Sequence, residues 1–209
     1  MNVIESLEWR YACKKFDEKK KLSTAQIDTL KKAFNLTATS FGLQPLKMLI
    51  VESQEILDKL APHAFYQKQV TTCSHLLIIC IDTEINSKTI DARFDLEKKI
   101  RGTSEDIVGD FRVQLKDMFA KKSEHEIEKS TIHQAYITLG NLMTVCAIEK
   151  IDACPMEGFL PEKFDEELHL KEQNLKSILL LPVGYRAQDD LMSAMKKVRK
   201  PLKETVISI

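Results

Sequence analysis

The sequence Asp152-Ala-Cys-Pro-Met-Glu-Gly-Phe159 is the stretch on which the predicted fold is centred. It follows a long apolar run with helical character and precedes a short helix that should begin at Pro161. Pro155 fixes a bend in the backbone, and Gly158 can take a positive φ angle that other residues avoid. Such a turn can aim main-chain N–H groups at a flat ligand, but an ordinary loop would have the same composition. The segments around the turn decide between these two alternatives.

Apolar runs on both sides of this turn predict the core of an α+β domain. The run Ser130–Ile148 is apolar nearly all round, which is typical of a central core helix. Residues 74–82 and 175–184 show no polar alternation and predict strands buried on both faces, and residues 46–51 predict a further strand. Strands that alternate with helices, with helices in excess, predict one domain over residues 1–209.

Two segments lie outside this pattern. Residues 84–129 are strongly charged and helical, and predict a helical excursion on the surface. The apolar residues of this excursion recur four apart, at Ile107, Phe111, Leu115 and Phe119. The tail, residues 195–209, has a basic cluster and then an apolar end with strand propensity. An exposed apolar strand is a liability unless it pairs, so we expect the tail to embrace a partner subunit.

Composition excludes several classes of protein. The chain has 31 basic and 31 acidic side chains, so nothing suggests binding to nucleic acid or to an anionic membrane. Its apolar runs are too short to span a bilayer, and its N-terminus does not resemble a secretory signal. The five cysteines form no Cys-x-x-Cys pair, which indicates reduced thiols in a cytoplasmic protein without a metal site. His75, at the start of a predicted strand, is interpreted as a structural histidine.

Three segments carry side chains suited to a ligand. Residues 10–15 place three cations among small and aromatic residues, which predicts either a phosphate site or a solvated basic turn. The loop at residues 37–45 offers the hydroxyl groups of Thr39 and Ser40, or is a plain helix-to-strand connection. A second basic cluster lies at residues 195–201. Neither Gly-x-Gly-x-x-Gly nor Gly-Lys-Ser/Thr occurs, so the chain has no Rossmann or P-loop motif.

Taken in chain order, these pieces resemble the nitroreductase family of FMN-dependent oxidoreductases, and the minimal oxygen-insensitive and dihydropteridine-reductase-like members in particular. The matching pieces are Arg10-Tyr-Ala-Cys-Lys-Lys-Phe-Asp17, Gln44-Pro45, residues 67–70 before Ser74-His75, Tyr136, Gly140-Asn141, Pro155–Phe159, Leu181–Arg186 and Lys197–Pro201. The resemblance covers nearly the whole chain. It implies an α+β fold whose central sheet is mixed but mostly antiparallel and is flanked by helices. It also implies an interlocked homodimer with FMN at the interface.

The resemblance assigns one group of residues to the FMN phosphate. Arg10, Lys197 and Arg199 match phosphate ligands, and Tyr11 and Ala12 lie in the same cofactor-binding segment. A phosphate that carries a charge near −2 needs several charge-assisted partners, and these three cations are far apart in the sequence. We therefore expect the fold to bring them together.

A second group is assigned to the flavin ring. Lys14 matches a cation at the N1/O2 edge, where it stabilises the negative charge of reduced flavin. The other residues that match ring contacts are Thr39 and Ser40 from the second subunit, Gln69, and the turn Pro155, Met156, Glu157 and Gly158. No side chain is expected to act as a nucleophile or base. The expected contributions to catalysis are the backbone of Glu157 and Gly158 and the charge of Lys14.

Three positions depart from the commoner family pattern. Ala12 replaces a serine, Tyr66 replaces an asparagine, and Gln69 replaces a lysine found in some relatives. One cation fewer at the pyrimidine end predicts a less stable reduced flavin. The lid over the ring falls in the variable region 84–129, where Phe111 and Phe119 are candidates.

The resemblance implies an NAD(P)H-dependent oxidoreductase of ping-pong type. NADH or NADPH would supply hydride through flavin N5 to a small flat acceptor such as a nitroaromatic, a quinone or a pterin. One alternative is an FMN-binding dimer that stores flavin or senses redox state through Cys13 or Cys154. A second alternative is a helical interaction protein without a cofactor.

Overall fold

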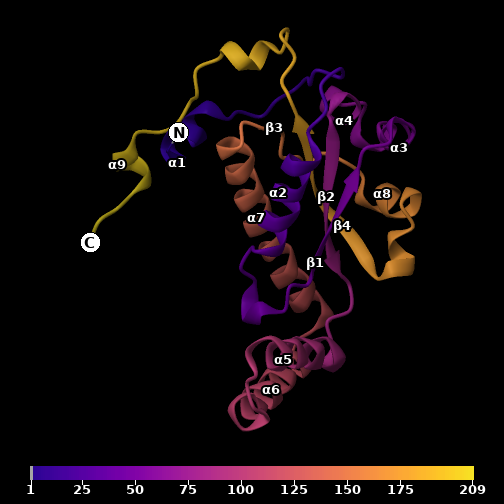
Figure 1. The fold of residues 1–209 in the computed structure, drawn as a ribbon, viewed down its shortest axis with the longest axis vertical. Helices are drawn as coiled ribbons and strands as arrows, with labels where there is room; N and C mark the ends of the chain where they lie inside the picture. The colour runs from indigo at the N-terminus through magenta and orange to yellow at the C-terminus, as the bar shows by residue number, and fades with distance from the viewer. Residues whose placement is uncertain (1) are drawn as a thin grey trace.

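A twisted sheet runs through the middle of the molecule (Figure 1). The computed structural model describes residues 2–209, and within them the sheet has the strand order β1-β2-β4-β3. The strands are β1 (Leu46–Val51), β2 (His75–Asp82), β3 (Asp152–Ala153) and β4 (Leu175–Gly184). All pairs of named strands are antiparallel, and a parallel bridge joins Ala12 to Ala153. The prediction of a mixed, mostly antiparallel sheet flanked by helices is confirmed.

Helices pack against both faces of this sheet. The longer helices of the chain are α1 (Val3–Trp9), α2 (Thr24–Asn35), α3 (Gln54–Leu60), α5 (Ser87–Arg101), α6 (Glu105–Ala120), α7 (Glu124–Ile148) and α8 (Pro161–Glu167), and the short ones are α4 (Lys68–Thr72) and α9 (Leu202–Thr205). Capping boxes begin α1 at Asn2, α2 at Ser23 and α7 at Ser123, because each side chain there accepts a bond from the N3 amide.

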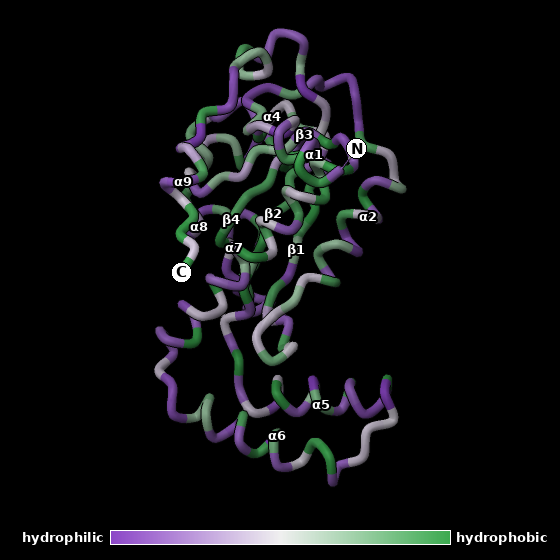
Figure 2. The backbone as a smooth tube through the Cα atoms, turned by 90° about the vertical axis from the view of Figure 1, so that its left-hand side faces the viewer, coloured by the Kyte–Doolittle hydropathy of each residue, from purple (hydrophilic) through white to green (hydrophobic). Residues whose placement is uncertain are grey.

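The strand β2 is buried on both faces, which explains its unbroken apolar sequence. Leu76, Ile78 and Cys80 point into the cluster that α3, α4 and α8 complete. Leu77, Ile79 and Ile81 point to the other face, where α2 and α7 cover them. Figure 2 shows the hydrophobic residues along β1, β2 and β4 as green stretches of the tube. The sheet is therefore the middle of three layers.

The central helix α7 is six residues longer at its start than the apolar run predicts. Its polar residue Asn141 donates to the Ala33 carbonyl at 3.1 Å and to the Thr37 hydroxyl at 2.8 Å. Asn141 therefore packs α7 against the end of α2 in the same chain. These bonds also hold the loop that follows α2.

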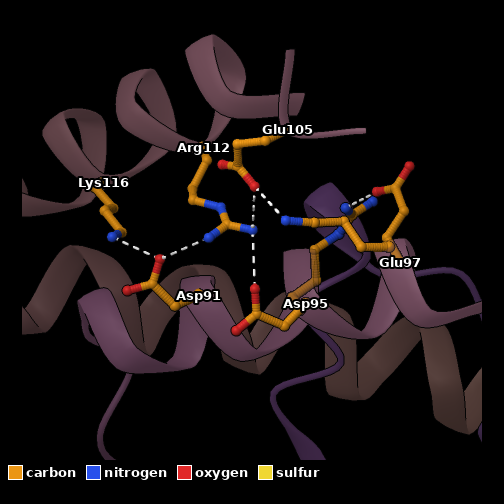
Figure 3. A network of polar contacts seen from close by, with 8 residues as sticks. Asp91, Asp95, Glu97, Glu105, Arg112 and Lys116 are labelled. Atoms are coloured by element: carbon orange, nitrogen blue, oxygen red, sulfur yellow. Dashed lines mark hydrogen bonds and ion pairs between the residues drawn. The ribbon is translucent and has the colours of Figure 1, made fainter. Parts of the chain in front are cut away.

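The charged segment after β2 forms a helical hairpin, α5 and α6, beyond one end of the sheet (Figure 1). Gly102, with φ of 69°, ends α5 in the left-handed conformation. Arg112 of α6 lies 3.0 Å from Asp95 of α5 and 3.4 Å from Glu105 of its own helix (Figure 3). Ile107 was expected in the apolar face, but it is 73% exposed because the buried face runs through Val108 and Leu115.

The tail leaves the body of the molecule after β4. Every residue from Leu191 to Ile209 is exposed, and the ribbon runs past α1 and away from the sheet (Figure 1). The exposed apolar side chains of the tail include Val198, Leu202, Ile207 and Ile209. No helix within residues 2–209 is long and apolar enough to cross a membrane.

Candidate functional site

A cavity of about 480 Å³ lies between the end of α1 and the tail. Its lining includes Arg10, Lys197 and Arg199, which come from opposite ends of the chain. The Lys197 ammonium donates to the Arg10 carbonyl oxygen. Burial, and then the charge of Arg199, lower the pKa of Arg10, and burial followed by the charges of Arg10 and Arg199 lowers the pKa of Lys197. The expected convergence of these cations is thus present in a cavity of the size that small ligands occupy, about 300–1,000 Å³.

The aspartate Asp190 joins the two segments that line this cavity. Its Oδ2 accepts hydrogen bonds from the Tyr11 hydroxyl at 3.0 Å and from the Lys14 main-chain N–H at 2.9 Å. Its Oδ1 accepts from the Met192 N–H at 3.1 Å. Burial alone would raise the pKa of Asp190, but these hydrogen bonds together lower it. Sequence reasoning missed this residue, because nothing in the chain distinguishes it from Asp189.

An ion pair at β3 packs against the same N-terminal segment. The Arg186 guanidinium reaches Asp152 Oδ1 through Nε at 2.8 Å and Nη2 at 2.6 Å. Its central carbon lies 4.4 Å from the Trp9 ring centroid and 4.6 Å from that of Tyr11. Trp9 is the single tryptophan of the chain and also lines the cavity. Its fluorescence is therefore a built-in probe for ligands there.

Beyond the cavity, Lys14 reaches toward the turn that follows β3. Its Nζ lies 3.6 Å from Cys154 Sγ, and the Cys154 side chain is fully buried. Burial raises the pKa of the Cys154 thiol, although the charges of Lys14 and Arg10 oppose that shift. Cys13 N–H donates to the Ala153 carbonyl at 3.2 Å, which fixes the two segments side by side. The cation and the turn are therefore neighbours.

The turn at residues 155–158 leaves two donors free. Met156 exchanges main-chain hydrogen bonds of 2.9 and 3.0 Å with Leu180 of β4, which anchors the start of the turn. The next two N–H groups, on Glu157 and Gly158, have no acceptor within residues 2–209, and both residues are exposed. The Glu157 side chain hydrogen-bonds to Tyr136 of α7 and raises the pKa of that phenol. These two N–H groups can therefore donate hydrogen bonds to an acceptor atom of a ligand.

Two glutamines support this turn from behind. Gln67 Nε2 donates to the Gly158 carbonyl at 2.7 Å and to the Ala64 carbonyl at 3.1 Å. Its Oε1 therefore faces the other way and accepts from Gln69 Nε2 at 3.0 Å. Gln69 is only 5% exposed. This pair links a position predicted at the flavin edge to the carbonyl of the turn.

Thr39 and Ser40 lie elsewhere in the chain. They precede β1, whose first residue pairs with Ile81, whereas the cavity and β3 lie at the opposite end of the sheet, near Gly184. The Ser40 N–H donates to Gln134 Oε1 at 3.0 Å, and the Thr39 hydroxyl accepts from the Gln44 N–H at 3.0 Å. One chain does not bring these two residues to the cations.

The remaining positions are placed as follows. His75 is buried beside the Ser74 hydroxyl, 2.9 Å from its Nδ1, as a structural histidine would be. All five cysteines are free thiols and buried. Ala12 lines the cavity, and Tyr66 is exposed with φ of 52°. Residues 2–209 hold no group of three or more His, Cys, Asp or Glu side chains placed to bind a metal.

Comparison with known proteins identifies the family. The family model described as "Nitroreductase family" matches residues 7–185. This chain belongs to the nitroreductase family. Its alignment with the oxygen-insensitive NAD(P)H nitroreductase of Salmonella typhimurium is 26% identical and covers 100% of both chains. A Staphylococcus aureus protein provisionally named as an NAD(P)H nitroreductase is 28% identical, over 90% of this chain and 87% of its own.

A solved structure shows the same fold. The protein of Exiguobacterium sibiricum, determined in complex with FMN, superposes with a TM-score of 0.85 at 20% identity, over 100% of this chain and 98% of its own. The predicted nitroreductase-like fold is thereby confirmed.

Proposed function

We propose that this chain is an NAD(P)H-dependent FMN oxidoreductase that reduces a flat electrophile by a ping-pong mechanism. Its relatives carry the name NAD(P)H nitroreductase, and a structural neighbour binds FMN. The observation that carries the proposal is the meeting of Arg10, Lys197 and Arg199 around one cavity. Three cations that line one cavity favour an anionic ligand.

The cavity fits the phosphate end of FMN. Arg10, Lys197 and Arg199 would hold the phosphate, which carries a charge near −2 and accepts several charge-assisted hydrogen bonds. Tyr11 and Ala12 line the wall beside them. An uncharged ligand would leave these cations without a counterion, so the site favours FMN over riboflavin.

The neighbouring turn fits the ring end. The free N–H groups of Glu157 and Gly158 would donate to the ring, and Lys14 would place its charge at the pyrimidine edge. Gln69, Pro155 and Met156 complete this part of the proposed site. Bound FMN would supply hydride acceptance and donation at N5, while the protein contributes binding, orientation and charge. The acceptor would be a nitroaromatic, a quinone or a pterin.

The working unit in this proposal is a cytoplasmic homodimer. The β1 edge of the sheet is unpaired within residues 2–209, and the apolar tail of the same chain covers nothing there. A strand from a second copy would satisfy such an edge. A second copy would also explain Thr39 and Ser40, which lie too far from the cations of their own chain to share a ligand with them.

The proposal is tested by adding NADH or NADPH to the FMN-loaded protein without oxygen. Rapid bleaching of the flavin absorption, and its return on adding a quinone, would support an oxidoreductase. A spectrum unchanged after minutes with either nicotinamide would favour a flavin-storage or redox-sensing dimer. A colourless protein that does not take up FMN would contradict both.

A further inference from the structure

We infer that Asp190 is a positioning residue of the phosphate cavity, one that sets the preference for FMN over riboflavin without touching the ligand. This inference rests on the proposed function for its ligand. Its structural part, that one buried carboxylate locks the two cation-bearing segments together, stands on the contacts within the chain.

Asp190 connects segments that are about 180 residues apart in the sequence. It accepts from Tyr11 and Lys14 on one side and from Met192 on the other. Tyr11 and Lys14 follow Arg10 in the same segment, while Met192 lies in the segment that leads to Lys197 and Arg199. Within residues 191–209 every residue is exposed, so the sheet does not hold that segment in place.

The charges of the cavity explain why such a lock is needed. Arg10, Lys197 and Arg199 line the same cavity and carry like charges. Besides burial, the charge of Arg199 lowers the pKa of Arg10, and the charges of Arg10 and Arg199 lower the pKa of Lys197. Without an anion in the cavity, this repulsion opposes the close approach of the two segments. Asp190 is 4% exposed, and each hydrogen bond it accepts comes from one of these two segments. It therefore keeps the cations in register before a phosphate arrives.

The adjacent residue provides a matched control. Asp189 carries the same charge one position earlier, but it is exposed and pairs with Lys15 at 2.5 Å across the surface. Exposed ion pairs contribute little to the stability of a fold. Asp189→Asn thus changes the net charge of the region by the same amount as Asp190→Asn and leaves the lock intact.

The test compares FMN and riboflavin affinities, measured by quenching of Trp9 fluorescence, in wild type, D190N, D189N, Y11F and Y11F/D190N. In D190N the ratio of FMN to riboflavin affinity should fall about tenfold or more, as expected for losing hydrogen bonds to a charged group. D189N should keep the wild-type ratio. Y11F should lower the ratio about threefold by itself and have little further effect in D190N, since both changes remove the same bond.

A second measurement needs no flavin. Hydrogen exchange of the main-chain amides at residues 10–14 and 192–199 should be faster in D190N than in wild type, and unchanged in D189N. If D190N leaves both the exchange and the ratio as in wild type, the inference is overturned. A ratio that rises in D190N would also overturn it, since Asp190 would then act only as a nearby negative charge. If wild type binds no FMN, the proposed function fails, while the exchange result still decides whether the lock exists.

Discussion

The side-chain amide of Gln67 lies 2.7 Å from the carbonyl oxygen of Gly158, and it bridges that oxygen to the Ala64 carbonyl. Since both partners are acceptors, only the NH₂ end of the amide can face them. The contact therefore fixes the orientation of Gln67 and, through it, of Gln69. It also fixes the peptide that follows the free N–H groups of Glu157 and Gly158.

Replacing Gln67 by glutamate should damage this arrangement. A carboxylate has no donor for the two carbonyl oxygens and is repelled by them, so we expect the free energy of unfolding to fall by roughly 1–3 kcal/mol. FMN affinity should fall as well, because the turn loses its support. Urea unfolding and FMN titration measure the two effects. Gln114→Glu on the exposed face of α6 is the control. Wild-type stability in Q67E would show that the hydrogen bonds of Gln67 to the two carbonyl oxygens do not stabilise the fold.

Replacing Gln69 by lysine should raise the midpoint potential of bound FMN. The new ammonium can still donate to Gln67 Oε1. It also restores the positive charge that some relatives carry at this position. A positive charge stabilises reduced flavin, and a shift of about 30 mV corresponds to roughly 1.4 kcal/mol for a two-electron couple. Spectroelectrochemistry measures this potential. Equal potentials in Q69K and wild type would refute the assignment of position 69 to the pyrimidine edge.

Some of these relationships were accessible from sequence and others were not. The strands Leu46–Val51 and Leu175–Gly184 were predicted with both ends correct, because each is a mainly apolar segment with turn-forming residues beside it. The convergence of Arg10 with Lys197 and Arg199 was expected only from the family resemblance, since no spacing rule joins the two ends of a chain.

Other features needed three-dimensional information. Asp190 has an identical neighbour in Asp189, and only the fold shows which carboxylate turns inward to Tyr11. The buried face of α6 was misplaced by one residue, from Ile107 to Val108, because a four-residue repeat drifts around a helix of 3.6 residues per turn. The packing partner of Asn141 depends on how α2 and α7 cross. The periodicity of the sequence does not determine that crossing.

Removing the apolar end of the tail should prevent dimer formation. A chain that ends at Lys200 lacks the apolar residues Leu202, Ile207 and Ile209, which are exposed in the single chain. Light scattering should give twice the 24.0 kDa chain mass for the full chain and close to 24.0 kDa for the shortened one. A full chain that runs as a monomer would refute the homodimer. A shortened chain that stays dimeric would place the interface elsewhere.

The stability of the fold should fall in mild acid through His75. Burial lowers the pKa of His75, so the unfolded chain, with a value near 6.5, binds a proton before the folded chain does. The contribution of His75 to the free energy of unfolding is therefore expected to be complete above about pH 6.5. It should decrease as the pH falls toward the pKa of the folded state. Urea unfolding at pH 7.5 and pH 5.5 measures the difference. It should shrink in His75→Gln and persist in His133→Gln, a change at an exposed site. An equal difference in all three proteins would assign the acid sensitivity to other groups.

The most direct test of the account is titration of wild type and Arg199→Ala with FMN and with riboflavin, followed through Trp9 fluorescence. Wild type should bind FMN at least tenfold more tightly than riboflavin, because Arg10, Lys197 and Arg199 meet around the cavity that would hold the phosphate. R199A should lose most of that preference with little change for riboflavin, whereas Lys200→Ala, next to it on the exposed tail, should keep it. If R199A bound FMN as tightly as wild type, the assignment of the cavity to the phosphate would be wrong.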